Sequence, residues 1–175
     1  MKKESGFTLG ELMVTLAIVG IVMAFAIPSM QTFVKNERLT TQINTLVSHL
    51  AYARSLAVTR RQQVILCASD NTTSCSDSGN WGAGWILFID VDNNSGFTAL
   101  VDEILRVKQA LAGGNTLVSS PTISSIIYDN RGFAPNSGGR TFSLCDDRGW
   151  SDPYYVKSIT ISNTGRVHQG GSASC

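Results

Sequence analysis

The sequence predicts an α+β fold, in which one long N-terminal helix packs on an antiparallel β-sheet and two disulfides fix the sheet domain. Three observations lead to this prediction. Apolar residues recur at helical spacing in the first third of the chain, short β-branched runs fill the rest, and four cysteines lie among those runs. Runs of strands after a single helix are typical of α+β domains. The 175 residues allow one domain with its own core.

The first element is a strongly apolar segment near the N-terminus. The sixteen residues from Leu12 to Ile27 carry no charge, and Thr15 is their only hydroxyl side chain. As one helix, residues 7–27 rise roughly 31 Å, which is about the thickness of a bilayer core. The net charge of the whole chain is only +1. This balance argues against non-specific binding to polyanions.

Two ordinary interpretations fit this segment. Lys2 and Lys3, followed by the apolar run and Ala24-Phe25-Ala26, resemble a cleaved secretory signal. A plain transmembrane anchor also fits, with Glu11 as a charge about one turn inside the membrane. Neither interpretation gives Glu11 a role.

A third interpretation explains Glu11. Cleavage between Gly6 and Phe7 creates an α-amino cation that lies roughly 6 Å along a helix from the Glu11 carboxylate. Between staggered parallel helices, these two charges neutralise each other and set the register of packing, because a buried unpaired charge is costly.

The order of residues at this end carries a resemblance. A short basic leader ends in Gly6, and Phe7, Glu11, an apolar stretch and Pro28 follow at fixed offsets. This arrangement resembles the class III signal of type IV pilins and type II secretion pseudopilins. The resemblance implies that residues 1–6 are a leader, that a prepilin peptidase cuts after Gly6, and that Phe7 is then N-methylated. Gly10 departs from the family, which usually has a bulky aliphatic residue there.

The helical pattern continues beyond Pro28, where the missing backbone donor predicts a kink. An apolar stripe with intervals of three and four residues follows, formed by Leu39, Ile43, Leu46, Leu50, Ala53 and Ala57. We therefore expect one helix of about fifty residues. Residues 7–28 form its transmembrane or filament-core half, and residues 29–62 form an amphipathic half that belongs to the globular domain.

Residues 63–175 are predicted to form a β-rich domain. Short β-branched or apolar runs, bounded by polar turns, predict its strands. These runs are 63–67, 84–89, 103–109, 122–128, 140–145, 155–162 and 165–168.

Four cysteines allow three disulfide pairings. With an export-type N-terminus, two disulfides in an oxidising periplasm are expected. We expect Cys67–Cys75, which staples a loop after a strand, and Cys145–Cys175, which pins the C-terminus. We expect no structural metal, because the chain lacks a C-x₂-C pair.

The globular residues extend the resemblance. The spacing of Cys67 and Cys75, Trp81, the strand 84–88 and the acidic segment from Asp90 resemble pseudopilin H of type II secretion and the related minor pilins of type IV pili. This resemblance implies a structural subunit that acts in filament assembly or initiation with other pilins. It also implies a single pass through the inner membrane with the globular domain in the periplasm.

The sequence contains little evidence for an ion-binding site or a catalytic site. Asp90, Asp92 and Asn94 match positions 1, 3 and 5 of a calcium loop, but the sixth residue is not Gly and the twelfth is not Glu. No nucleophile–base motif is present, and His49 is expected on a solvated flank of the helix. We therefore expect no enzyme, no metal and no cofactor.

DNA is the alternative partner. Some minor pilins of transformation systems bind DNA through a C-terminal Gly-Arg-x-Arg element, and the resemblance places Arg166 and His168 at its two basic positions. Arg131 and Arg140 are candidate neighbours in such a patch. Cleavage removes two lysines and one glutamate and leaves 12 basic and 12 acidic residues. DNA binding would therefore depend on a local patch.

Overall fold

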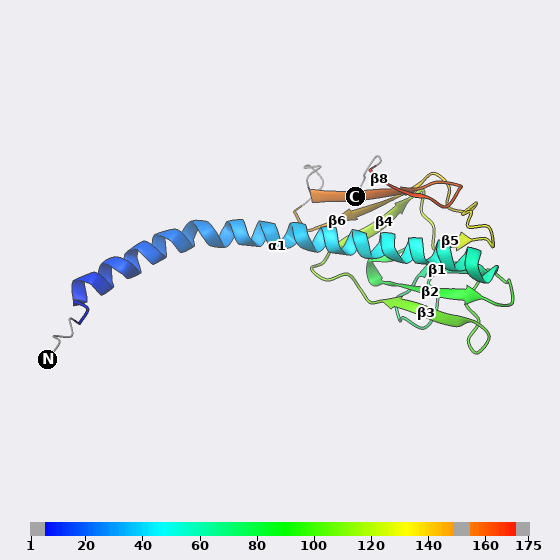
Figure 1. The fold of residues 1–175 in the computed structure, drawn as a ribbon, viewed down its shortest axis with the longest axis horizontal. Coiled ribbons are helices and arrows are strands. Elements are labelled where there is room, and N and C mark those ends of the chain that lie inside the picture. The colour runs from blue at the N-terminus through cyan, green and yellow to red at the C-terminus, as the bar shows by residue number, and fades with distance from the viewer. Residues whose placement is uncertain (1–5, 149–154, 171–175) are drawn as a thin grey trace. The chain divides into compact units, whose positions relative to one another are not determined.

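The structure is a computed structural model, and it describes residues 6–148 and 155–170. The helix α1 runs from Leu9 to Arg60. The other elements are β1 (Gln63–Ala68), the 3₁₀ helix η1 (Trp81–Ala83), β2 (Trp85–Asp90), β3 (Glu103–Lys108), β4 (Thr116–Ser120), β5 (Ser125–Tyr128), β6 (Arg140–Cys145), β7 (Val156–Ile161) and β8 (Val167–Gln169), as labelled or coloured in Figure 1. The chain divides into two compact units, Met1–Glu37 and Arg38–Cys175.

The first unit holds the N-terminal part of α1. Every described residue from 6 to 34 is exposed within this single chain. Within the described residues, α1 is the one helix long and apolar enough to cross a membrane. The helix continues through Pro28, so this proline does not end it, and the kink stays a prediction.

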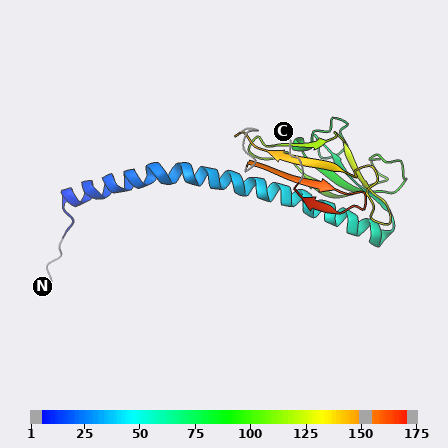
Figure 2. The same ribbon diagram turned by 90° about the horizontal axis from the view of Figure 1, so that it is seen from above.

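The second unit has a core built on the remainder of α1. All six residues of the predicted apolar stripe are buried, and Gln42 is buried with them. Side chains from strands of both sheets join the stripe in one hydrophobic cluster. The spacing of three and four residues therefore identified the correct face of the helix. Figure 2 shows this part of α1 running alongside the strands.

The strands form two antiparallel sheets, where the sequence analysis expected one. Sheet A has the order β3-β2-β1-β5, and sheet B has the order β4-β6-β7-β8. The strand β4 (Thr116–Ser120) was not predicted, because it is short and lies between a Gly-Gly turn and Pro121. The strand β5 begins at Ser125, three residues after the predicted start.

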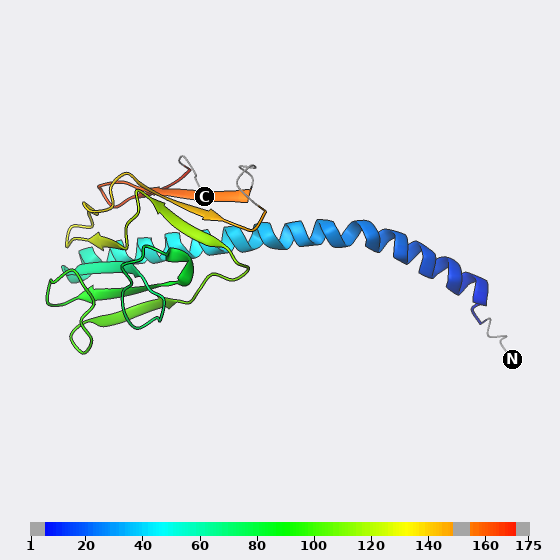
Figure 3. The ribbon, with the colours of Figure 1, turned by 180° about the vertical axis from the view of Figure 1, so that it is seen from behind.

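Sheet A is covered on both faces. One face joins the helix-bound cluster, and the other carries a second cluster formed by Ile65, Cys67, Ile86 and Phe88. Every residue of β2 is buried as a result. This explains why β2 reads as a continuous apolar run, since alternation appears only where one face meets water. Figure 3 shows the strands of sheet A and the helix from behind.

Candidate functional site

The first turn of α1 places the predicted processing residues. Gly6 and Phe7 precede the helix and are exposed, Phe7 at 87%. Thr8 caps the helix, because its Oγ1 accepts the Glu11 N–H at 3.2 Å while the Glu11 carboxylate accepts the Thr8 N–H at 2.9 Å. This reciprocal arrangement is a capping box. The role of Thr8 was not predicted, although a Thr-x-x-Glu spacing before an apolar run is the sequence signal of a capping box.

The exposed apolar residues of the first unit need a non-polar environment. Soluble monomers rarely expose apolar patches of more than a few hundred Å². Here large apolar side chains are exposed from Leu9 through Val34, including Phe25 at 76%. A lipid bilayer or a bundle of similar helices would satisfy them. Glu11, the carboxylate just before the apolar run, accepts hydrogen bonds from the backbone and side chain of Thr8, and from no other described residue in the chain.

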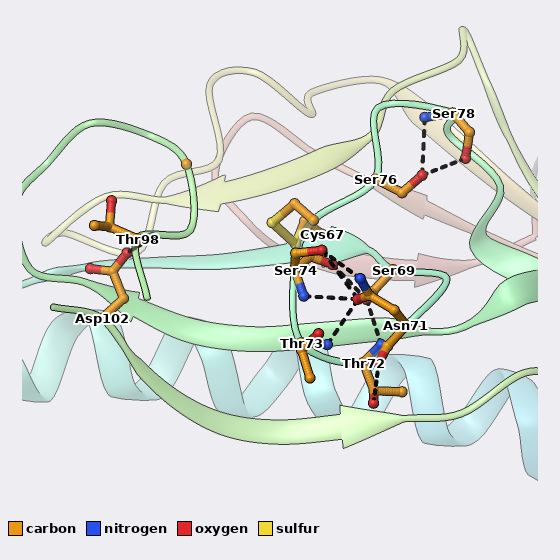
Figure 4. Close-up of a disulfide and its surroundings, with 12 residues drawn as sticks. Cys67, Ser69, Asn71, Thr72, Thr73, Ser74, Ser76, Ser78, Thr98 and Asp102 are labelled. Atoms are coloured by element: carbon orange, nitrogen blue, oxygen red, sulfur yellow. Dashed lines mark hydrogen bonds between the residues drawn. A yellow bond between two sulfur atoms is a disulfide. The ribbon is translucent and has the colours of Figure 1, made fainter. Parts of the chain in front are cut away.

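The disulfide Cys67–Cys75 is present, as the sequence analysis expected, with Cα atoms 5.6 Å apart. It closes the loop after β1, shown in Figure 4. Within that loop, Asn71 Oδ1 accepts the N–H groups of Thr73 and Ser74 at 3.0 and 2.9 Å. The disulfide therefore closes a loop that is also held by hydrogen bonds from its own side chains to its backbone. Cys67 and Cys75 pack in the cluster on the outer face of sheet A.

The second expected disulfide falls partly outside the described residues. Cys145 ends β6 and is buried, and none of the described cysteines is free. Cys175 is not among the described residues. The pairing Cys145–Cys175 therefore stays a prediction.

Carboxylates converge at the end of β2. Candidate ligand oxygens of Asp90, Asp92 and Asp102 lie within 4.8 Å of one another. Asp90 accepts N–H bonds from loop residues, among them Ser95 at 2.9 Å. Asp102 accepts the Thr98 N–H at 2.6 Å, and these two residues are labelled in Figure 4. Burial raises the pKa of Asp90, and nearby Asp92 and Asp102 raise it further against these hydrogen bonds. The arrangement organises the loop, and we assign no ion to it.

The structure separates the basic residues that were considered for DNA. Arg131 is paired with Asp129 at 3.0 Å. Burial raises the pKa of Asp129, but hydrogen bonds from Phe133 and Arg131 outweigh it and lower the pKa. Arg131 is thus already engaged by a carboxylate.

Arg140 and His168, two of the three remaining DNA candidates, lie on opposite faces of sheet B. His168 is paired with Thr160, whose hydroxyl contacts that of Thr141 at 3.0 Å, on the face away from the core. Arg140 is paired with Ile161, which is buried in the core. Since directly opposed residues point to the same side of a sheet, Arg140 faces the other way. Arg166 and His168 are both exposed.

The expectation of a solvated His49 is wrong, because this side chain is half-buried and bonded to the core. Its Nδ1 accepts the indole N–H of Trp85 at 3.0 Å. Burial lowers the pKa of His49, and the positive charges of Arg106 and Lys108 lower it further. A buried tryptophan on β2 needs a partner for its N–H, and the helix supplies one here.

Comparison with known families settles the class of this chain. The family model described as "Type II transport protein GspH" matches residues 42–165. This chain belongs to the GspH family. A model of the "Prokaryotic N-terminal methylation motif" matches residues 1–27 of this GspH-family chain. Members of the GspH family are structural pseudopilins, so the chain is not an enzyme.

Curated relatives match part of this GspH-family chain. Two sequences named "Fimbrial protein" from Pseudomonas aeruginosa are each 36% identical to it over 73 residues. The match covers 42% of this chain and 47% of each relative, so the chain spans about half the length of the curated relatives it matches.

Solved structures share the fold. The type IV minor pilin FimU of Pseudomonas aeruginosa superimposes with a TM-score of 0.60 at 23% identity, covering 80% of this chain and 93% of FimU. The minor pseudopilin EpsH of the Vibrio cholerae type 2 secretion system gives 0.52 at 11% identity, covering 78% and 99%. This GspH-family protein therefore shares its fold with a minor pilin and with a minor pseudopilin.

Proposed function

We propose that this GspH-family chain is a minor subunit of a type IV pilus or type II secretion pseudopilus and acts in filament assembly or initiation. The observation that carries the proposal is the exposed apolar helix, residues 9–34, joined to a domain whose own core is complete. Such a helix is stable only inside a membrane before assembly and among other helices after it. The inner membrane and the other pilins of the filament are its partners.

The proposal includes processing at the exposed N-terminal residues. A prepilin peptidase cuts between Gly6 and Phe7, and Phe7 is then methylated. We expect the intact mass from cells with the peptidase to lack Met1–Gly6 and to include one added methyl group. Retention of Met1–Gly6 in strains with and without the peptidase, or cleavage after Ala26, would contradict this.

Glu11 is proposed to set the register of the subunit in the filament. Its carboxylate would exchange the Thr8 hydrogen bonds for the α-amino group of a neighbouring subunit. We expect Glu11→Gln to leave membrane insertion and cleavage intact and to reduce the amount of this chain in sheared filaments. Glu37→Gln, which changes an exposed carboxylate of the same helix, is the matched control. Equal incorporation of both variants would remove the register role.

DNA uptake receives less support and is not part of the proposal. Arg140 and His168 lie on opposite faces of sheet B, and Arg131 is paired with Asp129. Because affinity for DNA rises with the number of phosphates that cations contact, separated cations predict weak binding.

The globular domain is proposed to lie in the periplasm, beyond the inner membrane. The Cys67–Cys75 disulfide supports this side, because disulfides persist in oxidising compartments. Protease added to spheroplasts should therefore digest the domain, while protection in intact spheroplasts would place it in the cytoplasm.

A further inference from the structure

Three of the four sheet edges in the described residues are closed by specific contacts. On β3, a bulge interrupts the ladder and the Arg106 side chain donates to the Leu105 carbonyl at 2.8 Å. Along β5, the amide of Asn136 accepts the Ile127 N–H at 3.0 Å and donates to the Ser125 carbonyl at 3.1 Å. The edge of β4 packs against η1. Natural sheets close their edges in these ways because open edges pair with other chains.

The fourth edge, β8, is open. The N–H of Gly170 donates to the Ser158 carbonyl on β7 at 2.9 Å. Since antiparallel strands alternate inward and outward backbone groups, the N–H and C=O groups of Val167 and Gln169 point away from β7. None of the described residues hydrogen-bonds to these four groups.

A groove of about 290 Å³ lies beside this edge. The groove is lined by residues of α1, β7 and the end of β8, namely Thr40, Ile43, Asn44, Val156, Lys157, Ser158, Ile159, Gln169 and Gly170. Ile43 and Ile159 are buried and give it an apolar floor. An added strand would bond to the backbone of β8 and place alternate side chains in this groove, which is how strand addition combines affinity with specificity.

The charges along the edge of β8 indicate which kind of strand could be added there. Lys157 lines the groove, and no carboxylate is among the lining residues. Along the same edge, Arg166 just before β8 and His168 on the sheet face away from the core are both exposed. None of these three side chains has an ion-pair partner among the described residues. A second copy of this chain pairing through β8 would bring the positive charges of Lys157 and Arg166 in the two copies together, which is unfavourable. A segment that carries a carboxylate complements them.

We infer that β8 accepts an extended, acidic segment of a different, neighbouring filament subunit, which adds a fifth strand to sheet B. This inference rests on the proposed function, because that function supplies the neighbours. A DNA strand would use Arg166 and His168 but has no use for an open backbone edge beside an apolar groove.

Photo-crosslinking in cells that produce the full chain tests the inference. We place the photoreactive residue p-benzoylphenylalanine at Gln169, with Val107 on the closed edge β3 as the matched control position, 46% exposed. The expected adduct from Gln169 joins an acid-containing segment of another prepilin-type subunit, identified by mass spectrometry, and Val107 gives no adduct with that segment. An adduct only with a second copy of this chain, with its own residues or with DNA would overturn the inference.

A third position separates this test from that of the proposed function. The same photoreactive residue at Leu16, in the exposed apolar helix, reports assembly with any neighbouring helix. Adducts at Leu16 without adducts at Gln169 would overturn the strand-addition inference and leave the filament function standing. No adducts at either position would count against both.

A proline variant tests the backbone bonds directly. Gln169→Pro removes an N–H that points away from β7, so the β7–β8 ladder stays intact. Gln169→Ala keeps that N–H and is the matched control. With the photoreactive residue at the exposed groove position Asn44, we expect the proline to lower the adduct yield roughly threefold to tenfold and the alanine by less than about twofold. Equal yields, with unchanged thermal unfolding of both variants, would contradict the inference.

Discussion

Gly165 occupies a position that only glycine can fill. Its φ is +74°, and a Cβ built there would overlap the Gly132 carbonyl oxygen and lie 2.9 Å from the Tyr128 ring. The same Gly132 oxygen accepts the hydrogen bond of Arg54 Nε at 3.1 Å. In Gly165→Ala, the left-handed backbone costs about 1 kcal/mol, the lost Arg54 bond about 1 kcal/mol, and the overpacking of a buried site about 1–2 kcal/mol.

The total destabilisation expected for Gly165→Ala is therefore about 3–4 kcal/mol. Gly139→Ala is the matched control, because Gly139 has φ +75° but nothing within 4 Å of its Cβ position. It should cost only about 1 kcal/mol. Full-length protein in detergent micelles is unfolded thermally while the fluorescence of buried Trp81 and Trp85 is followed. We expect midpoints lowered by roughly 10 °C and 3 °C, respectively. Equal shifts for the two variants would show that the crowding at Gly165 has no energetic consequence.

Three further predictions concern the same unfolding measurement. The double change Cys67→Ser and Cys75→Ser should destabilise the domain by about 2.5 kcal/mol, the chain-entropy value for a short loop, and a reductant should then lower the stability of the variant by less than it lowers that of the unchanged chain. The pKa of His49 is lowered in the folded state, so the folded protein binds a proton at His49 less readily than the unfolded chain does. The contribution of His49 to stability is therefore complete above about pH 6.5 and is lost as the pH falls below that value. His49→Gln should flatten the pH dependence of stability between about pH 7.5 and 5.5, and an unchanged slope would contradict this prediction. Gln42→Leu leaves the buried amide of Asn115, which donates to Gln42 at 2.7 Å, without its acceptor. This change should lower the free energy of unfolding by about 2 kcal/mol, whereas an unchanged stability would mean that water replaces the bond.

The sequence predicted the parts of the fold that depend on local pattern. The apolar stripe from Leu39 to Ala57 identified the buried face of α1, because helical spacing alone decides which side chains share a face. The Cys67–Cys75 disulfide followed from a short loop between two strands. The two prepilin-like features, Phe7 and Glu11, were found by their order along the chain.

Contacts between residues far apart in the sequence could not be predicted from the local sequence pattern. The strand 116–120 has a short sequence that is stable only because it pairs with β6 and packs on η1. His49 has the spacing of a solvated residue, yet it meets Trp85 across 36 positions of sequence. The faces of Arg140 and His168 depend on strand registers, and a shift of one residue would exchange them.

The position of β5 in the chain has a consequence for folding. This strand lies in sequence between β4 and β6, both in sheet B, yet it pairs with β1 in sheet A. The chain therefore passes from one sheet to the other and back before the last strands form. Neither sheet is therefore formed by a single contiguous piece of chain. The domain should therefore unfold in one cooperative step. In the proposed periplasmic arrangement, it would complete its folding only after most of the chain has crossed the membrane.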